Sequence, residues 1–169
     1  MVSVIDAYRF LDGFARRTMR NWASLGTTPG PIPWTPLAQP LAQSRIAIVS
    51  SAAMALNGDR PFDLQIERQD PWSSDPSYRV IPRSARSGEV QIGHLHINPA
   101  FAREDLNCLM PLERLADLAA AHEIGDSAPS HYSYAGYTLR PERLLHETVP
   151  LMIQRMKEER VDGVVLVPV

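Results

Sequence analysis

The apolar positions of residues 4–22 recur every three or four residues, and arginine and aspartate side chains fill the opposite side. This spacing is typical of an amphipathic helix, which we expect to end within residues 24–26. Residues 27–40 contain five prolines, which exclude both a helix and a central strand. The pattern therefore predicts an N-terminal helix over residues 1–26 and a proline-rich arm over 27–44, ahead of a domain that begins at residue 45.

Three apolar runs in residues 45–169 predict strands. Residues 45–50 (RIAIVS) and 161–167 (VDGVVLV) are nearly continuous runs rich in isoleucine and valine, as in strands buried on both faces of a parallel sheet. Residues 90–97 predict another strand after a turn. We expect the carboxyl ends of all three strands to lie side by side, because adjacent parallel strands converge on one crevice.

Helical patterns alternate with these strands. Pro111 is well placed to open a helix that closes near Gly125, and a second helical pattern covers residues 141–156 with a kink expected at Pro150. Residues 57–82 form a long, ordered, polar loop that can include one edge strand. The alternation predicts an α/β domain of three layers, with a mainly parallel sheet and helices on both faces.

Composition narrows the function classes. The 169 residues carry 17 basic and 19 acidic side chains, and the scattered basic residues argue against nucleic acid as a partner. No apolar run approaches the ~20 residues of a membrane helix, and no secretory signal precedes the domain, so we expect a cytoplasmic protein without a membrane partner. The one cysteine, Cys108, lies between Leu106 and Leu109, and we predict that it is packed in the core.

His94 and His96 are the sharpest local feature. Residues two apart on a strand share a face, so both imidazoles would point the same way. Three interpretations stay open: polar residues at a strand end, a metal-free pair for substrate binding or proton transfer, and a zinc site. The zinc site would need a third ligand from His131, Asp105 or Glu104. We expect no tightly held metal, because only two ligands are close in sequence.

Residues 130–137 concentrate one histidine and three tyrosines. In an extended strand, His131 and Ser133 would share one face, while Tyr132 and Tyr134 would lie on the other. The stretch is either an edge strand whose aromatic layer packs on a helix, or a pocket wall. In the pocket wall, His131 would act as an acid, a base or a hydrogen-bond donor.

Ser50 and Ser51 follow the first strand and could offer hydroxyls and backbone donors to an anion, although a plain turn explains them as well. The chain contains neither of the glycine-rich sequence motifs that bind the phosphates of nucleotides, so we expect no dinucleotide cofactor. We assign no other cofactor to the chain. It also lacks the Gly-x-Ser-x-Gly nucleophile elbow of many hydrolases.

Several stretches in order resemble the selenoprotein B family of the glycine, sarcosine, betaine and D-proline reductases, especially its short stand-alone members. They are PIPWTPLAQPL at 31–41, RIAIVSSAA at 45–53, PFD at 61–63, DPSYRVIPR at 75–83, GHLHIN at 93–98, MPLERLADLA at 110–119, EIGDSAPSHYSYAGY at 123–137 and ERVDGVVLVPV at 159–169.

In that family a redox selenocysteine or cysteine directly follows a strand that ends in a Pro-Val pair. The sequence here ends at Pro168-Val169, so the resemblance implies that it stops one residue before the expected nucleophile. A selenocysteine codon read as stop, a natural protein that lost its redox tail, and a cut made at the strand end are three explanations.

The resemblance implies reductive cleavage of a carbon–heteroatom bond in a small amino-acid-like substrate, together with a second reductase subunit; a homodimer is the alternative assembly. We expect His94, His96 and His131 to be the catalytic polar groups of the substrate pocket. Ser50, Ser51, Tyr132 and Tyr134 are the candidate substrate-binding residues. The rival functions are a catalytically silent binding or scaffold subunit and a histidine-ligated metal enzyme.

Overall fold

The computed structural model describes residues 12–24, 35–70, 72–136 and 138–169. The chain divides into two units, residues 1–36 and residues 37–169. The first contains helix α1 (Gly13–Ser24), which confirms the predicted helix from residue 13 onward. The carboxylate of Asp12 accepts a hydrogen bond of 2.9 Å from the N–H of Ala15 and caps this helix. Residues 1–11 and 25–34, which include parts of the predicted helix and of the proline-rich arm, lie outside the described residues, and the domain boundaries at 26 and 44 stay predictions.

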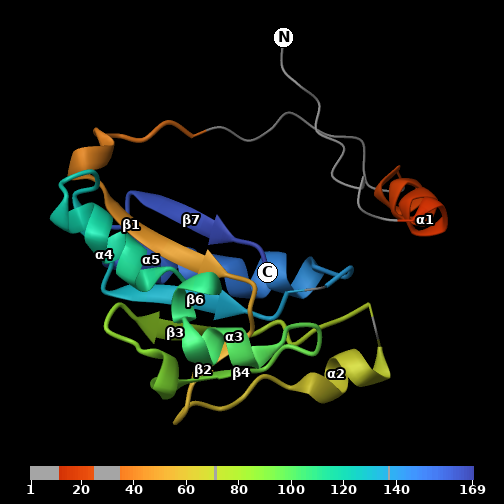
Figure 1. Ribbon diagram of the computed structural model, residues 1–169. Helices are drawn as coiled ribbons and strands as arrows, with labels where there is room; N and C mark the ends of the chain where they lie inside the picture. The colour runs from red at the N-terminus through yellow and green to blue at the C-terminus, as the bar shows by residue number, and fades with distance from the viewer. Residues whose placement is uncertain (1–11, 25–34, 71, 137) are drawn as a thin grey trace. The chain divides into compact units, whose positions relative to one another are not determined.

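A mainly parallel sheet forms the centre of the second unit (Figure 1). β1 lies inside it and pairs in parallel with β7 on one side and with β5 and β6 on the other; β3 pairs antiparallel with β6 at the far edge. The bounds are β1 (Arg45–Ser50), β3 (Tyr78–Pro82), β5 (Asp126–Ser127), β6 (Ser130–Tyr134) and β7 (Gly163–Val167). This sheet confirms the predicted strands at both ends of the domain and the edge strand expected within residues 57–82. The expected burial of the last strand is wrong, because among the described strands β7 pairs only with β1 and exposes Val164, Val165 and Leu166.

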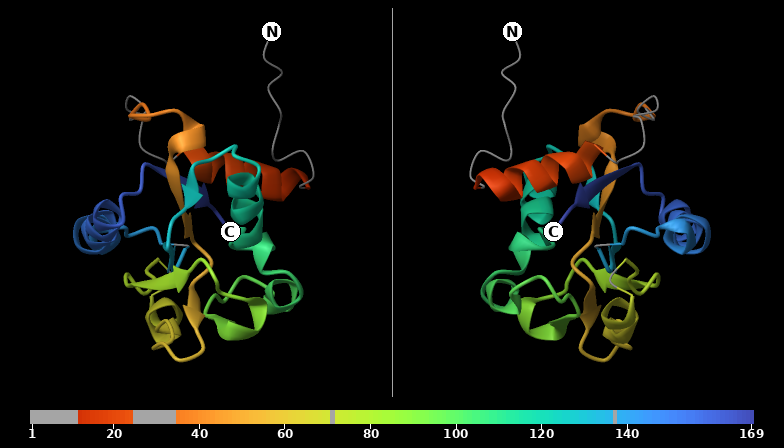
Figure 2. Two further views of the ribbon diagram at one scale, coloured as in Figure 1. Left: turned by 90° about the vertical axis from the view of Figure 1, so that its left-hand side faces the viewer. Right: turned by 90° about the vertical axis from the view of Figure 1, so that its right-hand side faces the viewer.

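Helices cover both faces of the sheet. Figure 2 shows α4 (Leu112–Ala120) and α5 (Val149–Glu158) on opposite sides of the strands. Alternate residues of β1 belong to the two cores: Ile46 and Ile48 to the core of α3 (Pro99–Glu104) and α4, and Ala47 and Val49 to the core of α5. This alternation follows from the two-residue period of a strand. The expected three-layer α/β architecture is confirmed.

The helical pattern over residues 141–156 is interrupted, as Pro150 suggested. A π-helical segment, Leu144–Thr148, precedes α5, and Pro150 lies in the first turn of α5. Proline has no N–H to donate, so the first turn is the place in an α-helix that tolerates it. No helix in the described part of the chain is long and apolar enough to cross a membrane.

The prediction of a strand over residues 90–97 is wrong in both the length of the strand and its neighbouring strands. β4 (Val90–Ile92) pairs antiparallel with β2 (Met54–Leu56) in a separate two-stranded sheet. Both sides of β1 are already occupied by other strands, and the chain leaves β4 at Gly93, whose N–H donates to the carbonyl of Ala53. Helix α2 (Leu64–Gln69) also forms within the stretch expected to be a loop. Only the first and last predicted strands therefore converge.

Candidate functional site

The carboxyl ends of β1 and β7 meet. The N–H of Ser51 donates to the carbonyl of Val167 at 3.1 Å, and the N–H of Val169 donates to the Ser51 hydroxyl oxygen at 2.9 Å. The neighbouring end of β6 joins them, because the N–H of Gly136 donates to the Ser51 carbonyl at 2.9 Å. Ser51 therefore connects three chain segments at the edge where parallel sheets commonly bind ligands.

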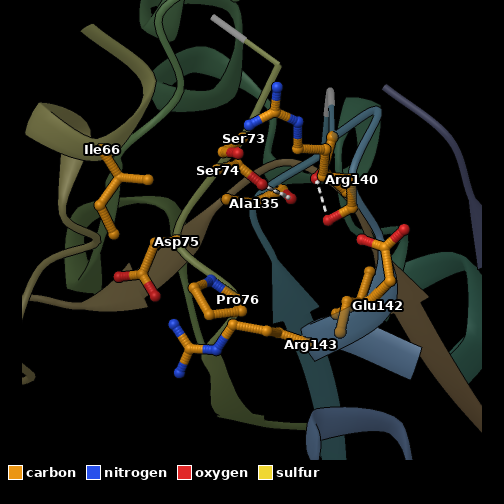
Figure 3. Close-up of a pocket in the computed structure, with 11 residues that line it drawn as sticks. Ile66, Ser73, Ser74, Asp75, Pro76, Ala135, Arg140, Glu142 and Arg143 are labelled. Carbon is orange, nitrogen blue, oxygen red and sulfur yellow. Dashed lines mark hydrogen bonds between the residues drawn. The ribbon is translucent and has the colours of Figure 1, made fainter. Parts of the chain in front are cut away.

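A cavity of about 310 Å³ lies beside this edge, just beyond the end of β6 (Figure 3). It reaches the sheet at Ala135, whose carbonyl accepts a hydrogen bond from the hydroxyl of Ser74 at 3.1 Å. The lining residues come from α2, from the loop before β3 and from the chain between β6 and α5: Ile66, Ser73, Ser74, Asp75, Pro76, Ala135, Thr138, Arg140, Glu142, Arg143 and Leu144. The volume suits a small molecule.

Asp75 is the acidic group that hydrogen bonds hold most firmly in this cavity. One carboxylate oxygen accepts from the N–H of Asp63 at 2.9 Å, and the other accepts from the N–H of Ser77 at 2.9 Å and from the Ser77 hydroxyl. Burial opposes ionisation, but these hydrogen bonds, aided by the charge of Arg79, keep the pKa of Asp75 below its ordinary value. The carboxylate is therefore ionised at neutral pH and fixed in orientation.

Arg143 supplies the opposite charge. It directly precedes the π-helical segment, and Figure 3 shows its guanidinium directed toward the same space as the Asp75 carboxylate. That segment is attached to the cavity wall, because the hydroxyl of Thr148 donates to the carbonyl of Pro76. Arg140 also lines the cavity, but its guanidinium points away in Figure 3 and pairs with Asp70 at 2.8 Å. π-Helical turns are frequent at functional sites, so this position is consistent with a binding role.

The two predicted serines have different roles. Ser50 is fully buried, and its hydroxyl donates to the carbonyl of Leu109 at 2.7 Å while accepting from the N–H of Ala52 at 3.3 Å. Both partners belong to the protein's own backbone, and the hydrogen bond to Leu109 connects β1 to the turn before α4. Ser51 forms the hydrogen bonds with Val167, Val169 and Gly136 described above, and neither serine lines the cavity.

His94 and His96 lie together in the turn after β4. Their ring centroids are 5.7 Å apart, and His94 Nδ1 accepts a hydrogen bond from the N–H of His96 at 3.1 Å. His96 Nε2 lies 2.6 Å from a carboxylate oxygen of Glu67 on α2. Burial lowers the pKa of His94, and the Glu67 charge offsets this only in part. The pair does not line the cavity, although α2 contributes both Glu67 and the cavity residue Ile66.

A metal ligand set is not assembled around these histidines. Within the described ranges, no group of three or more histidine, cysteine, aspartate or glutamate side chains has the geometry to hold an ion. Of the candidate third ligands, Asp105 caps the turn before α4 and accepts hydrogen bonds from Asn107.

His131 does not lie with His94 and His96, because it is buried inside the sheet. Its Nδ1 accepts a hydrogen bond from the N–H of Ile48 at 3.0 Å, and its Nε2 lies 3.3 Å from the hydroxyl of Ser127. Pro129 separates β5 from β6, and the imidazole supplies the acceptor that a strand carbonyl would otherwise give to Ile48. Burial, together with the charge of Arg83, lowers the pKa of His131 to about 4.

Tyr132 and Tyr134 face the core under α5. Tyr132 is fully buried in the cluster that includes Met152 and Met156, and its ring centroid lies 6.0 Å from that of Tyr78. Burial raises the pKa of both phenols. The strand alternation expected for this stretch is present, and the aromatic face packs on a helix. Neither tyrosine lines the cavity.

The prediction that Cys108 is buried is wrong, because its side chain is exposed. Cys108 ends a single 3₁₀ turn, Leu106–Cys108, in which Leu106 and the following Leu109 take the inward positions. We therefore expect Cys108 in the native protein to react stoichiometrically with a disulfide reagent such as DTNB, without prior unfolding. Cys108→Ser should remove the signal. A thiol that reacts only in denaturant would contradict the exposed position.

The sequence contained no strong signal for the charged cavity residues. Asp75 begins a stretch quoted for the family resemblance, but Arg143 lies 68 positions away and outside every such stretch. No short motif links an acid and a base at this separation. Their proximity follows from tertiary contacts between the loop before β3 and the segment before α5.

Comparison with known proteins finds a distant relationship to a reductase. D-Proline reductase subunit gamma from Acetoanaerobium sticklandii is 30% identical over 139 residues, which cover 82% of this chain and 54% of that protein. The chain thus spans about half the length of this curated relative. No family model matches the chain, and no solved structure matches it. The chain is therefore distantly similar to a D-proline reductase subunit.

Proposed function

We propose that this chain is a selenoprotein B-like reductase domain that binds a small amino-acid-like substrate for reductive cleavage of a carbon–heteroatom bond. The similarity to D-proline reductase subunit gamma supports the reductase role. The observation that carries the proposal is the convergence of Ser51, Gly136 and Val169 beside the cavity. A reactive group that followed Val169 would begin at the same edge of the sheet as the bound substrate.

The proposed chemistry needs a strong nucleophile and two electrons. A selenolate or thiolate after Val169 would attack the substrate carbon, and the carbon–heteroatom bond would break with the electron pair leaving on the heteroatom, which is then protonated. A second thiol would attack the selenium or sulfur and release the product carbon with a proton. The selenenyl sulfide or disulfide that remains would be reduced by an external dithiol.

We propose that the domain works with a second reductase subunit, because the relative is named as a subunit. His94, His96 and His131 stay candidates as catalytic groups, and Ser50, Ser51, Tyr132 and Tyr134 stay candidates for substrate binding. The geometry favours Ser51 among them, because it forms hydrogen bonds with Val167, Val169 and Gly136 at this edge. The hydrogen bonds that join His94, His96 and Glu67 support a role for this cluster in proton transfer.

A silent binding or scaffold subunit is the second candidate function. It is favoured by one observation: the residues that line the cavity include no cysteine. A small molecule could therefore bind without any thiol of the lining to attack it. The histidine-ligated metal enzyme is not proposed.

Reading the genomic DNA past the codon for Val169 separates these functions. The reductase predicts an in-frame UGA codon followed by an open frame that encodes a cysteine. An ordinary stop codon without continuation would overturn it and leave the scaffold role.

The protein itself offers a second test. We expect a Cys108→Ser chain extended by one cysteine after Val169 to gain a thiol that is alkylated near neutral pH. The Cys108→Ser chain without the extension is the matched control. An added cysteine that resists alkylation would contradict an accessible reactive position at this edge.

A further inference from the structure

Two opposite charges of the cavity are held ready for a ligand. Three hydrogen bonds from neutral donors hold Asp75, and the positive charges of Arg79 and Arg143 act on it without a salt bridge to another described residue. Arg143 forms an ion pair at 3.1 Å with Glu147, four positions along the chain, and both side chains of that pair are exposed. Exposed pairs of this kind contribute only about 0.3–0.5 kcal/mol, so Arg143 can exchange Glu147 for a ligand anion at little cost.

The remaining lining gives the ligand an apolar body. Ile66, Pro76, Ala135 and Leu144 contribute hydrocarbon surface to the same lining. A larger, more open hollow of about 670 Å³ shares Ile66, Asp75, Pro76 and Arg143 with the cavity. The charged pair therefore lies where the two spaces meet, which gives a ligand a route from solvent.

We infer that Asp75 and Arg143 are the specificity-determining pair of this cavity, and that they bind the ammonium and the carboxylate of one small zwitterion. A carboxylate fits the planar donors of an arginine, and an ammonium or iminium N–H fits a carboxylate whose orientation is already fixed. A ligand with only one of these charges would leave the other protein group without its partner. The inference deepens the proposed function and rests on it for the role of the cavity.

The test compares three ring compounds of similar size on the full 169-residue chain, by calorimetry or NMR titration. Proline carries both charges, pyrrolidine carries only the ammonium, and tetrahydrofuran-2-carboxylate carries only the carboxylate. We expect each single-charge compound to bind at least about tenfold more weakly than proline, as loss of a charged hydrogen-bond partner usually costs. Equal binding of all three would overturn the inference without any variant.

Two substitutions assign the charges. Arg143→Gln should weaken proline and tetrahydrofuran-2-carboxylate at least about tenfold and leave pyrrolidine unchanged, while Asp75→Asn should weaken proline and pyrrolidine and leave the carboxylate unchanged. Arg114→Gln is the matched control, because it removes the same charge and an exposed ion pair, with Asp117 at 3.0 Å, outside this cavity. Equal losses in Arg114→Gln and Arg143→Gln would overturn the assignment.

The outcomes separate this inference from the proposed function. Failure of all three compounds to bind the folded chain overturns the zwitterion inference, whereas the DNA reading past Val169 tests the reductase role on its own. Asp75→Asn replaces one of the two carboxylate oxygens, which accept three hydrogen bonds, with an NH2 donor group, so its thermal unfolding is measured in parallel. If that variant is unfolded, Arg143→Gln with the three compounds decides the result.

Discussion

Lowering the pH from 7 to 4 is expected to remove roughly 3 kcal/mol of folding free energy through one side chain, His131. The imidazole is inaccessible to solvent inside the sheet, where it accepts a hydrogen bond from the N–H of Ile48. Only the unprotonated Nδ1 can accept that bond. Protonation in the folded state would therefore break the bond and place a charge in the core.

The direction of the effect follows from the two pKa values. Burial lowers the pKa of His131 in the folded protein from 6.5 to about 4, while the unfolded chain keeps the ordinary value. Between these values the unfolded state binds more protons than the folded state, so acid favours unfolding. The contribution of neutral His131 to the free energy of unfolding is complete above pH 6.5 and is lost as the pH falls toward 4.

Urea denaturation at several pH values between 7 and 4 measures this loss. His131→Gln cannot titrate in this range, so its free energy of unfolding should fall less steeply than that of the wild type. His94 also has a lowered pKa, so its protonation further reduces the free energy of unfolding in acid. This reduction occurs in both proteins and therefore cancels when they are compared. Identical pH dependence in both proteins would show that His131 does not stay neutral in the folded state.

The sequence predicts the parts of this fold that local pattern controls. The runs at β1 and β7 form strands as predicted, although β7 is not buried as expected. Pro111 directly precedes α4, and Pro150 interrupts the last helical pattern. Each of these features depends on one segment's own residues. The meeting of β1 and β7 at Ser51 also followed, because parallel strands of one sheet share their carboxyl edge.

The rest depends on contacts that no single segment contains. The apolar residues of β4 suit a strand, but they cannot specify whether the partner is β1 or β2. His131 has the residue type of a catalytic base, yet the break at Pro129 turns it into a backbone acceptor. Asp75 and Arg143 became a candidate site only when the fold brought two distant segments to one cavity. The convergence of strand ends therefore indicated the region of this cavity, whereas residue types alone did not identify Asp75 and Arg143.

Gly136→Ala is expected to destabilise the protein by about 1–3 kcal/mol, the usual cost of adding a methyl group to a filled space. A Cβ built at Gly136 would lie 2.9 Å from both the Cβ and the carbonyl oxygen of Ser51, and 3.1 Å from its hydroxyl oxygen. The carbonyl belongs to the backbone that closes the edge between β1 and β6, so it cannot rotate away as a long side chain could. Relief requires the two segments to separate.

Gly58 provides the matched control, because a Cβ there would have no neighbour within 4 Å. Gly58→Ala should change the free energy of unfolding by less than about 1 kcal/mol, and the change can be stabilising. The separation caused by Gly136→Ala should also weaken ligand binding, since the preceding residue, Ala135, forms part of the cavity wall. Thermal melts and proline titration of both variants measure the two effects. A Gly136→Ala protein as stable as Gly58→Ala, with unchanged binding, would show that the end of β6 is not packed tightly against Ser51.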